Sequence, residues 1–248
     1  MDENKPVTRK IDKIYIIRIA DPLSIERSED CAKSCEDVGM PYEFWKGTQG
    51  IQGKDLHLQF DFPIEFKHVY SIPHSNATAS HIKLWKHILD NKETAIILEH
   101  DAYMLHKVDM EIPDGAIVVM GYKLMNKDDY DHVTAGPPKT ISQAFQHCGA
   151  HAYAITWKTA EELIDEVKKY GVRSCIDTGY FMRIGNTKPW GKKDPPPAKQ
   201  TGIPLMRMDP TPAIGWVRDA RSTVAYGSGA ANFHLTPSFR QNLRTNKK

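Results

Sequence analysis

Short apolar runs alternate with segments of helical periodicity along the first part of the chain. Residues 13–19 form a short run rich in β-branched side chains, which predicts the first strand. Asp21 and Pro22 then supply an N-cap residue and a proline at the first helical position. The helix is expected to reach about residue 38 and to stop at Gly39. With a second strand predicted at 42–46, this strand–helix–strand opening is typical of a parallel, nucleotide-binding sheet.

The same pattern predicts two more helices and three more strands further along. Residues 47–75 are rich in Gly, Gln, His and Pro, and we expect loops over the active face there. Apolar residues on one side of 80–91 predict a helix, and the apolar run 94–99 has the length of a central buried strand. A capping box beginning at Thr159 predicts a helix that ends at Gly171. The remaining strands are predicted at 116–120 and 151–156.

Length and composition fit a single α/β domain over residues 1–248, with a Rossmann-type, mostly parallel sheet flanked by helices. The residues are 40% hydrophobic and 26% charged, and the formal net charge of +2 gives no reason to expect binding to nucleic acid or a membrane surface. Residues from about 186 to 248 are expected to be loop-rich, with a proline-rich flap at 188–202.

Cysteine spacing and the absence of long apolar runs bear on the cellular compartment. No run is long enough to span a bilayer, and the first apolar stretch is too short for a signal peptide. Cys31 and Cys35 lie one helical turn apart without a second pair at zinc-finger spacing, so we interpret the cysteines as buried thiols. We therefore expect a cytoplasmic protein without a transmembrane segment.

Two carboxylates at the end of the predicted strand 94–99 are the most informative pair in the sequence. Glu99 and Asp101 lie two residues apart, so on an extended chain both point to one side while His100 points away. In open α/β sheets, ligands bind at the carboxyl ends of strands. Paired carboxylate oxygens suit Mg²⁺ or Mn²⁺, and such an ion can hold a diphosphate. The alternative is a strand end that carries solvated acids.

With these residues in view, the chain resembles glycosyltransferase family 25, the group of lipooligosaccharide and collagen galactosyltransferases. The similarity spans roughly residues 14 to 223, and its strength lies in several motifs that occur in a shared order. The matching segments are Ile14-Tyr15-Ile16-Ile17 with Arg27, Ser80-His81-Ile82-Lys83-Leu84-Trp85, Ala95 to Asp101, Gly149 to Ile155, Ile176-Asp177, and Pro212 to Gly215 followed by Arg221-Ser222-Thr223.

The resemblance implies a GT-A-like fold and an inverting transfer of a sugar, often galactose, from a UDP-sugar with the help of Mn²⁺ or Mg²⁺. The acceptor would be a hydroxyl of a glycan, a lipid-linked sugar or a protein, as in lipopolysaccharide biosynthesis. Two departures from the family pattern stand out. His100 replaces the middle Asp of the acidic triplet, and Ala150 replaces the threonine of a Gly-Thr-His segment.

If the chain is a family 25 transferase, Asp101 is the first expected metal ligand. Glu99 is then its neighbour at the metal or a contact to the donor. His234 is a candidate to complete the metal shell. An inverting transfer needs a general base beside the acceptor hydroxyl, and Asp177 is the candidate. The alternative for Asp177 is an N-cap of the short apolar stretch 180–182.

Four further residues are candidates for contacts to the donor, each with a structural alternative. Arg27 is suited to pair with the diphosphate, or it lies on the solvated side of its helix. Ser80 and His81 contact donor or acceptor, or they form the N-terminal turn of their helix. His151 also contacts a substrate, or it is a hydrogen-bonded structural residue at the start of a strand.

Three other functions remain open at this point. A degenerate family member would bind a nucleotide-sugar or glycan without catalysis, and His100 favours that alternative. A metal-dependent phosphoryl hydrolase would use the same acidic strand end but would need additional carboxylates. Nucleic-acid binding is the weakest of the three, because the basic residues are dispersed and balanced by acids.

Overall fold

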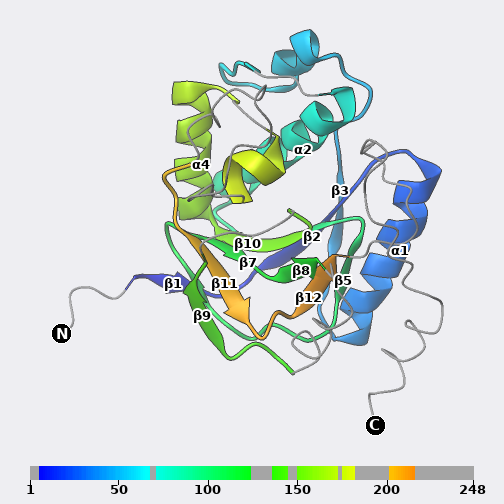
Figure 1. The fold of residues 1–248 in the computed structure, drawn as a ribbon, viewed down its shortest axis with the longest axis vertical. Coiled ribbons are helices and arrows are strands. Elements are labelled where there is room, and N and C mark those ends of the chain that lie inside the picture. The colour runs from blue at the N-terminus through cyan, green and yellow to red at the C-terminus, as the bar shows by residue number, and fades with distance from the viewer. Residues whose placement is uncertain are drawn as a thin grey trace, which may run out of the picture.

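A seven-stranded sheet with helices on both faces forms the centre of the described structure (Figure 1). The computed structural model describes residues 6–67, 71–123, 136–144, 150–172, 175–181 and 201–215. In sheet order the strands are β3 (Glu43–Lys46), β2 (Lys13–Arg18), β4 (Thr94–Glu99), β10 (Ala152–Thr156), β7 (Ile117–Val119), β11 (Leu205–Asp209) and β9 (Thr140–Gln143). The expected α/β class, with a large sheet flanked by helices, is confirmed.

The pairing within this sheet is mixed. Strands β3, β2 and β4 are parallel neighbours, as are β7 and β11. Strand β10 runs antiparallel to both β4 and β7, and β9 is antiparallel to β11. The first three strands are parallel because a helix returns the chain across the sheet between them, as parallel pairing requires. The predicted strand–helix–strand opening is therefore present, inside a sheet that also contains antiparallel pairs.

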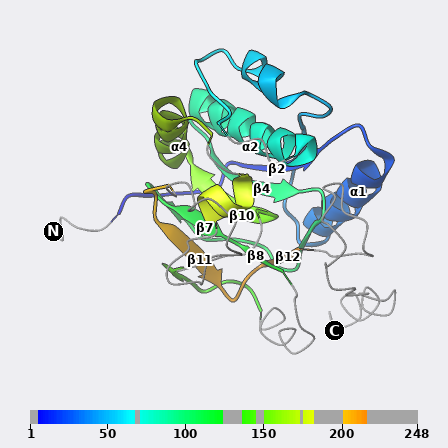
Figure 2. The ribbon, with the colours of Figure 1, turned by 45° about the horizontal axis from the view of Figure 1, so that its top comes forward.

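Helix α1 (Pro22–Asp37) lies on one face of the sheet, and α2 (Ile72–Asn91) and α4 (Trp157–Tyr170) lie together on the other. Figure 2 shows α2 and α4 side by side above the strands, apart from α1. The predicted cap of α1 is confirmed, since the Asp21 carboxylate accepts the backbone N–H of Leu23 and of Ser24. Gly39 follows the helix end with a φ of +71°.

Two helix starts were predicted too late. Helix α2 begins at Ile72 and is capped by Ser71, eight residues before the predicted start. Its first turns bury small polar side chains, including Asn76 and Thr78, so no apolar periodicity marks them. Helix α4 begins at Trp157, because the hydroxyl of Thr156 accepts the Thr159 N–H and is the true cap.

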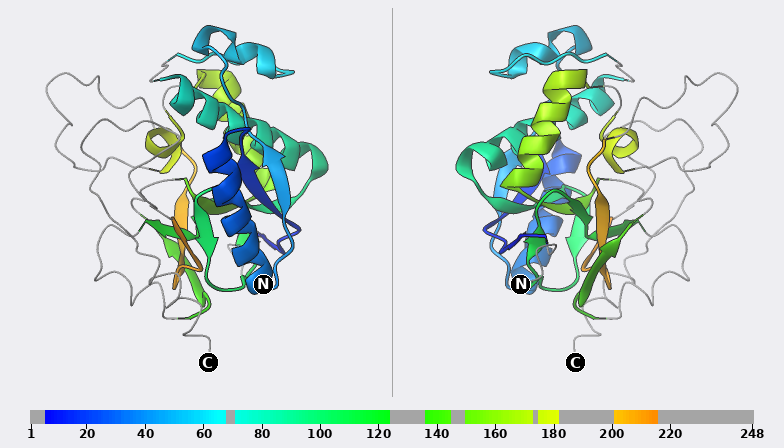
Figure 3. Two further views of the ribbon diagram at one scale, coloured as in Figure 1. Left: turned by 90° about the vertical axis from the view of Figure 1, so that its right-hand side faces the viewer. Right: turned by 90° about the vertical axis from the view of Figure 1, so that its left-hand side faces the viewer.

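The segment predicted to consist of loops contains a 3-10 helix, η1 (Gly53–Gln59). Figure 3 shows η1, in light blue, on the side of α2 that faces away from the sheet. It therefore covers α2 rather than the carboxyl ends of the strands. Much of the predicted loop-rich third, including nearly all of the flap at 188–202, lies outside the described residues.

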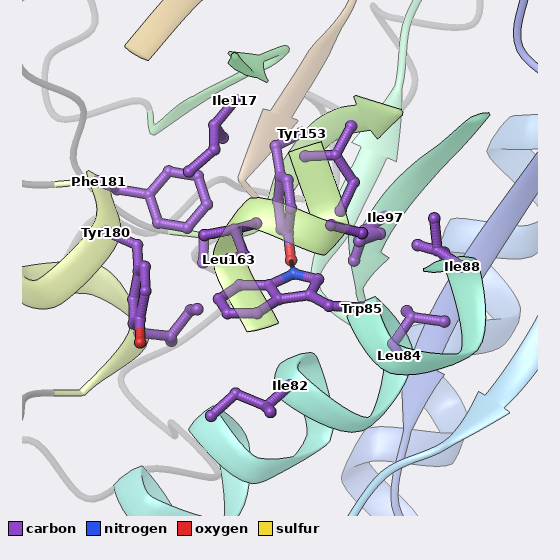
Figure 4. Packing of buried hydrophobic residues seen from close by; sticks show 14 of the residues in the cluster. Ile82, Leu84, Trp85, Ile88, Ile97, Ile117, Tyr153, Leu163, Tyr180 and Phe181 are labelled. Atoms are coloured by element: carbon purple, nitrogen blue, oxygen red, sulfur yellow. Dashed lines mark hydrogen bonds between the residues drawn. The ribbon is translucent and has the colours of Figure 1, made fainter. Parts of the chain in front are cut away.

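Alternating residues of each strand divide the core into two layers. On the face covered by α2 and α4 the central strands place Tyr15, Ile17, Ile97, Tyr153 and Ile155. Figure 4 shows part of this layer around Trp85 and Leu163. On the face covered by α1, the strands contribute Ile14, Ile16, Ile96, Leu98 and Ala154. Cys31 and Cys35 of α1 pack against them, which confirms those two as buried thiols.

Smaller sheets extend the structure at two places. Strands β5 (Ala102–Met104), β12 (Ala213–Gly215) and β8 (Gly121–Lys123) form a three-stranded sheet directly after the ends of β4 and β7. Strands β1 (Thr8–Arg9) and β6 (Ile112–Pro113) form a separate pair. A five-residue π-helix, η3 (Asp177–Phe181), follows α4. Among the helices that the structure describes, none combines the length and apolarity needed to cross a membrane.

Candidate active site

The carboxyl ends of β2 and β4 and the start of β10 meet at one edge of the sheet. Ile17 pairs with Glu99 in the parallel register of β2 and β4. On the other side of β4, the Glu99 N–H donates to the His151 carbonyl at 2.9 Å. Glu99 and His151 are therefore direct neighbours on adjacent segments of the chain. They lie at the edge where open α/β sheets bind ligands.

His81 reaches this edge from α2. Its Nε2 lies 3.1 Å from Glu99 Oε1, and its Nδ1 lies 2.8 Å from the Tyr153 hydroxyl. The Trp85 indole N–H donates to the same hydroxyl at 2.8 Å, and Figure 4 shows the hydroxyl directed at the indole nitrogen. The three ring residues are almost fully buried, whereas the Glu99 side chain keeps 27% of its surface exposed. Glu99 is thus anchored from within and partly exposed at the sheet edge.

Burial determines the protonation states of His81 and Tyr153. It lowers the pKa of His81 to about 4, although the negative charge of Asp177 acts in the opposite direction. Burial also raises the pKa of Tyr153 well above its ordinary value; the Trp85 hydrogen bond opposes this rise and the Glu99 charge adds to it. At neutral pH, His81 is therefore a neutral imidazole and Tyr153 a neutral phenol.

Asp177 lies on the same face of the sheet as His81. It is the first residue of η3, and its charge acts on both His81 and His74, the latter with a pKa lowered mainly by burial. The backbone N–H of Ile176 donates to the Thr78 hydroxyl at 3.0 Å, which fixes the start of η3 against α2. The predicted base therefore lies in the electrostatic neighbourhood of His81, where a partly exposed carboxylate can take a proton.

Asp101 occupies a different environment from Glu99. One of its carboxylate oxygens, Oδ1, is buried and has no hydrogen-bond partner among the described residues. The pKa of Cys31 in α1 is raised first by burial, then by Cys35, and also by the Asp101 charge. The predicted convergence with Glu99 assumes extended backbone, but β4 ends at Glu99 and the chain turns at His100 and Asp101. Convergence of the two carboxylates on one ion stays a prediction.

Ser80 connects α2 to the loop that follows β3. Its hydroxyl accepts the Thr48 N–H at 2.8 Å and donates to the Asn76 carbonyl at 2.8 Å. Because α2 begins at Ile72, Ser80 and His81 lie in mid-helix, and the alternative that they form its N-terminal turn is wrong. Both hydrogen-bonding directions of the Ser80 hydroxyl serve the fold, so its contribution to the edge is to hold the loop in place.

The buried His151 ring packs against two neighbouring strands of the small sheet. A Cβ atom added at Gly121 would overlap the imidazole, and one added at Gly215 would come within 2.8 Å of its Cγ. These two glycines therefore form a seat for the ring on β8 and β12. Neither glycine can be recognised as part of this seat from the sequence, because nothing in the local sequence shows that the two strands pair under His151.

Two other predicted residues lie elsewhere. Arg27 is 5% exposed and lies one turn before Cys31 on the buried side of α1, so the solvated alternative is wrong. It approaches from the face opposite α2. His234 lies outside the described residues, and within the part of the chain that the structure describes no group of three or more His, Cys, Asp or Glu side chains could hold a metal ion.

The comparisons with known proteins concern the first half of the chain. Residues 11–114 match the family model of glycosyltransferase family 25 (LPS biosynthesis protein). The matched range contains Arg27, Ser80, His81, Glu99 and Asp101, while His151 and Asp177 follow it. A search of curated proteins found no match. The resemblance is therefore confirmed over residues 11–114, and this family 25 match supports a glycosyltransferase enzyme.

Proposed function

We propose that the chain transfers galactose or a related hexose from a UDP-sugar to an acceptor hydroxyl, using Mn²⁺ or Mg²⁺ in a GT-A-like fold. One observation carries the proposal: the Glu99 carboxylate is anchored by His81 at the carboxyl end of the central strand β4 and remains partly exposed. The family match to residues 11–114 supplies the reaction class. An anchored acid at this edge suits a diphosphate held through a cation.

The transfer is an inverting displacement at the anomeric carbon. The acceptor oxygen forms a bond to this carbon on the side opposite the diphosphate, and the bond to the diphosphate breaks with its electron pair leaving on the phosphate oxygen. The acceptor hydroxyl loses its proton to the Asp177 carboxylate, which acts as general base. The partial exposure of Asp177 beside His81 supports this role. The products are the glycosylated acceptor, inverted at the anomeric centre, and UDP.

Asp101 and Glu99 would hold the divalent ion, and His234 is the candidate for a further ligand. When bound, the ion supplies Lewis-acid stabilisation of the charge that develops on the diphosphate. The buried Oδ1 of Asp101 fits such an ion, because a buried carboxylate oxygen without a donor is costly unless a cation or hydrogen bond compensates it. The residues present are thus compatible with the proposed metal.

The acceptor class follows from the family description, which names LPS biosynthesis. A glycan or lipid-linked sugar hydroxyl is therefore the first acceptor to test, followed by a protein hydroxyl. Transfer in the cytoplasm would give access to cytosolic nucleotide-sugars. Radiolabelled UDP-galactose incubated with these acceptor classes, with and without Mn²⁺, would identify which class receives label.

Thermal stabilisation tests donor choice. UDP-, GDP- and CMP-sugars are added separately with and without Mn²⁺, and only the UDP-sugar with Mn²⁺ should raise the melting temperature, since a ligand at 100 times its Kd stabilises the native state by about 2.7 kcal/mol. Glu99→Gln should lose this shift. Glu93→Gln is the matched control, because Glu93 is bonded to Tyr15 and precedes the opposite end of β4. Equal shifts in Glu99→Gln and the wild type would refute the role of Glu99.

Turnover separates the enzyme from the degenerate alternative. Asp177→Asn should bind UDP-sugar with Mn²⁺ as the wild type does and lose transfer, because the amide cannot take the acceptor proton. Full turnover by Asp177→Asn would remove it as the base. A wild type that binds the donor but neither transfers nor hydrolyses it would support the binding-only alternative.

A further inference from the structure

Four buried or half-buried side chains form one hydrogen-bonded chain from the core to the sheet edge. It runs from the Trp85 indole to the Tyr153 hydroxyl, then through both nitrogens of His81 to Glu99 Oε1. The links measure 2.8, 2.8 and 3.1 Å. Trp85 and Tyr153 are 0% exposed and His81 is 1% exposed. The direction of every link can be derived from the chemistry of its two ends.

The direction of the hydrogen bond between Trp85 and Tyr153 is fixed by the indole. An indole N–H only donates, so the Tyr153 oxygen accepts from Trp85. The single phenolic hydrogen of Tyr153 is then available for the other bond, and it donates to His81 Nδ1. Nδ1 must therefore carry a lone pair rather than a proton.

An imidazole with a lone pair on Nδ1 carries its proton on Nε2, and Nε2 faces the Glu99 carboxylate. In this tautomer, His81 donates a charge-assisted hydrogen bond to Oε1. In the other tautomer the lone pair of Nε2 would face a lone pair of Glu99 Oε1 at 3.1 Å. The proton on Nδ1 would at the same time point at the phenolic hydrogen of Tyr153. The core therefore selects the one tautomer that can hold the acid.

We propose that Trp85 and Tyr153 are positioning residues that fix the Nε2–H tautomer of His81, and that His81 thereby holds the Glu99 carboxylate in its ligand-binding orientation. The effect on transfer rests on the proposed function of Glu99, whereas the tautomer itself does not. Residues that orient a ligating or catalytic side chain through a hydrogen bond affect affinity or rate without touching the substrate.

A second Tyr–His–Glu group in the same core provides an internal control. Tyr15 on β2 donates directly to Glu93 at 2.7 Å, and its oxygen lies 3.1 Å from His87 Nε2. Glu93 immediately precedes β4, so this group lies at the end of the strand opposite Glu99. Tyr15→Phe removes the same hydroxyl from the same layer of the core without affecting the chain to Glu99.

The tautomer is read directly from the ¹⁵N chemical shifts of His81 in the full-length protein at neutral pH. The wild type and Tyr15→Phe should show a protonated Nε2 and an unprotonated Nδ1. Tyr153→Phe should show a shift toward the mixture typical of free imidazole, because without the phenolic donor the ring can turn and present either nitrogen to Glu99. Transfer should fall by about tenfold to a hundredfold in Tyr153→Phe, the range expected for a weakened hydrogen bond to a charged group. Tyr15→Phe should stay within about twofold, because its hydroxyl serves only the fold.

Replacing His81 distinguishes its two bonds. In His81→Gln the amide nitrogen occupies the place of Nε2 and donates to Glu99, whereas in His81→Asn the shorter amide accepts from Tyr153 and does not reach the acid. Transfer by the Gln variant should exceed that of the Asn variant by about tenfold. Equal activities, a wild-type proton on Nδ1, or an unchanged tautomer in Tyr153→Phe would each overturn the inference.

Failure of the proposed function gives a different result. If Glu99→Gln retains full transfer, the role of Glu99 is wrong, and the tautomer measured in the wild type and in Tyr153→Phe still decides whether the core directs His81. If Glu99→Gln loses transfer while Tyr153→Phe keeps both its tautomer and its activity, the function stands and the positioning role fails.

Discussion

At the scale of single residues, the polar side chains near the end of β4 differ in how their hydrogen bonds are met. Both ring nitrogens of His81 form hydrogen bonds inside the protein, and the Ser80 hydroxyl both accepts and donates one there. Asp101 presents a buried oxygen with no partner among the described residues. A fully satisfied buried group specifies the fold, whereas a buried carboxylate oxygen without a protein donor suits a cation or a water hydrogen bond. This difference is why we assign support to His81 and cation binding to Asp101.

The lowered pKa of His81 makes stability depend on pH. In the unfolded chain this histidine has its ordinary pKa near 6.5, but the folded value is about 4. As the pH falls below about 6.5, the unfolded state therefore binds a proton that the folded state rejects, and stability is lost until about pH 4. In the metal-free protein, the free energy of unfolding of the wild type minus that of His81→Gln should fall by about 2 kcal/mol between pH 7 and pH 5. Urea unfolding at the two pH values measures this difference, and no change would show that His81 titrates normally.

The seat of His151 gives a steric prediction. Gly121→Ala places a methyl group into the imidazole, and the overpacking should cost about 1–3 kcal/mol and displace the ring. Gly202→Ala is the matched control, because its Cβ would lie 3.4 Å from Glu166 Oε1, an ordinary contact. Thermal unfolding of both variants tests the seat. Equal melting temperatures would show that the ring is free to move aside.

At the scale of elements, the start of α4 depends on Thr156. Thr156→Ala removes the hydroxyl that accepts the Thr159 N–H, so it should destabilise the protein by about 1 kcal/mol. Thr156→Ser keeps the hydroxyl and should recover most of the loss. Chemical denaturation measures both variants. If Ser were no better than Ala, the cap would contribute nothing and the loss would come from packing at this buried position.

Element types could be predicted from sequence wherever apolar periodicity was strong. The strand ending at Glu99 was predicted with its observed bounds, and the cap and end of α1 followed from Asp21 and Gly39. The first turns of α2 could not be predicted, because their buried side chains are small and polar. Thr159 resembled a cap because Glu162 follows it by three residues, as in a capping box, and only the backbone shows that Thr156 occupies the cap position.

The site could be predicted only in part. The strand-end pattern selected Glu99, and motif resemblance selected His81, His151 and Asp177. The structure brings His81, Glu99 and His151 to one edge of the sheet, with Asp177 in the electrostatic neighbourhood of His81. Their support could not be predicted, since the Trp85–Tyr153 bond joins positions 68 residues apart and the His81–Tyr153 bond joins positions 72 apart. The turn after Glu99 was also missed, because period-2 alternation assumes that the strand continues.

At the scale of the whole molecule, the two halves of the chain contribute different parts of one edge. The family-matched range supplies the anchored acid and the helix that holds it. The later strands and η3 supply His151 and the proposed base, Asp177. Donor binding and proton transfer are therefore expected to be separable by mutation, with donor affinity sensitive to Glu99 and turnover sensitive to Asp177.

The central claim is that acidic side chains at the end of β4 bind a divalent ion and, through it, a nucleoside diphosphate. The most direct measurement is Mn²⁺-dependent transfer from UDP-galactose by the wild type, Asp101→Ala and Asp109→Ala, the last being an exposed acid in the same region of the chain. Asp101→Ala should keep the wild-type circular dichroism spectrum and lose metal-dependent transfer by at least about a hundredfold, while Asp109→Ala stays active. Undiminished Mn²⁺-dependent transfer by folded Asp101→Ala would contradict the account.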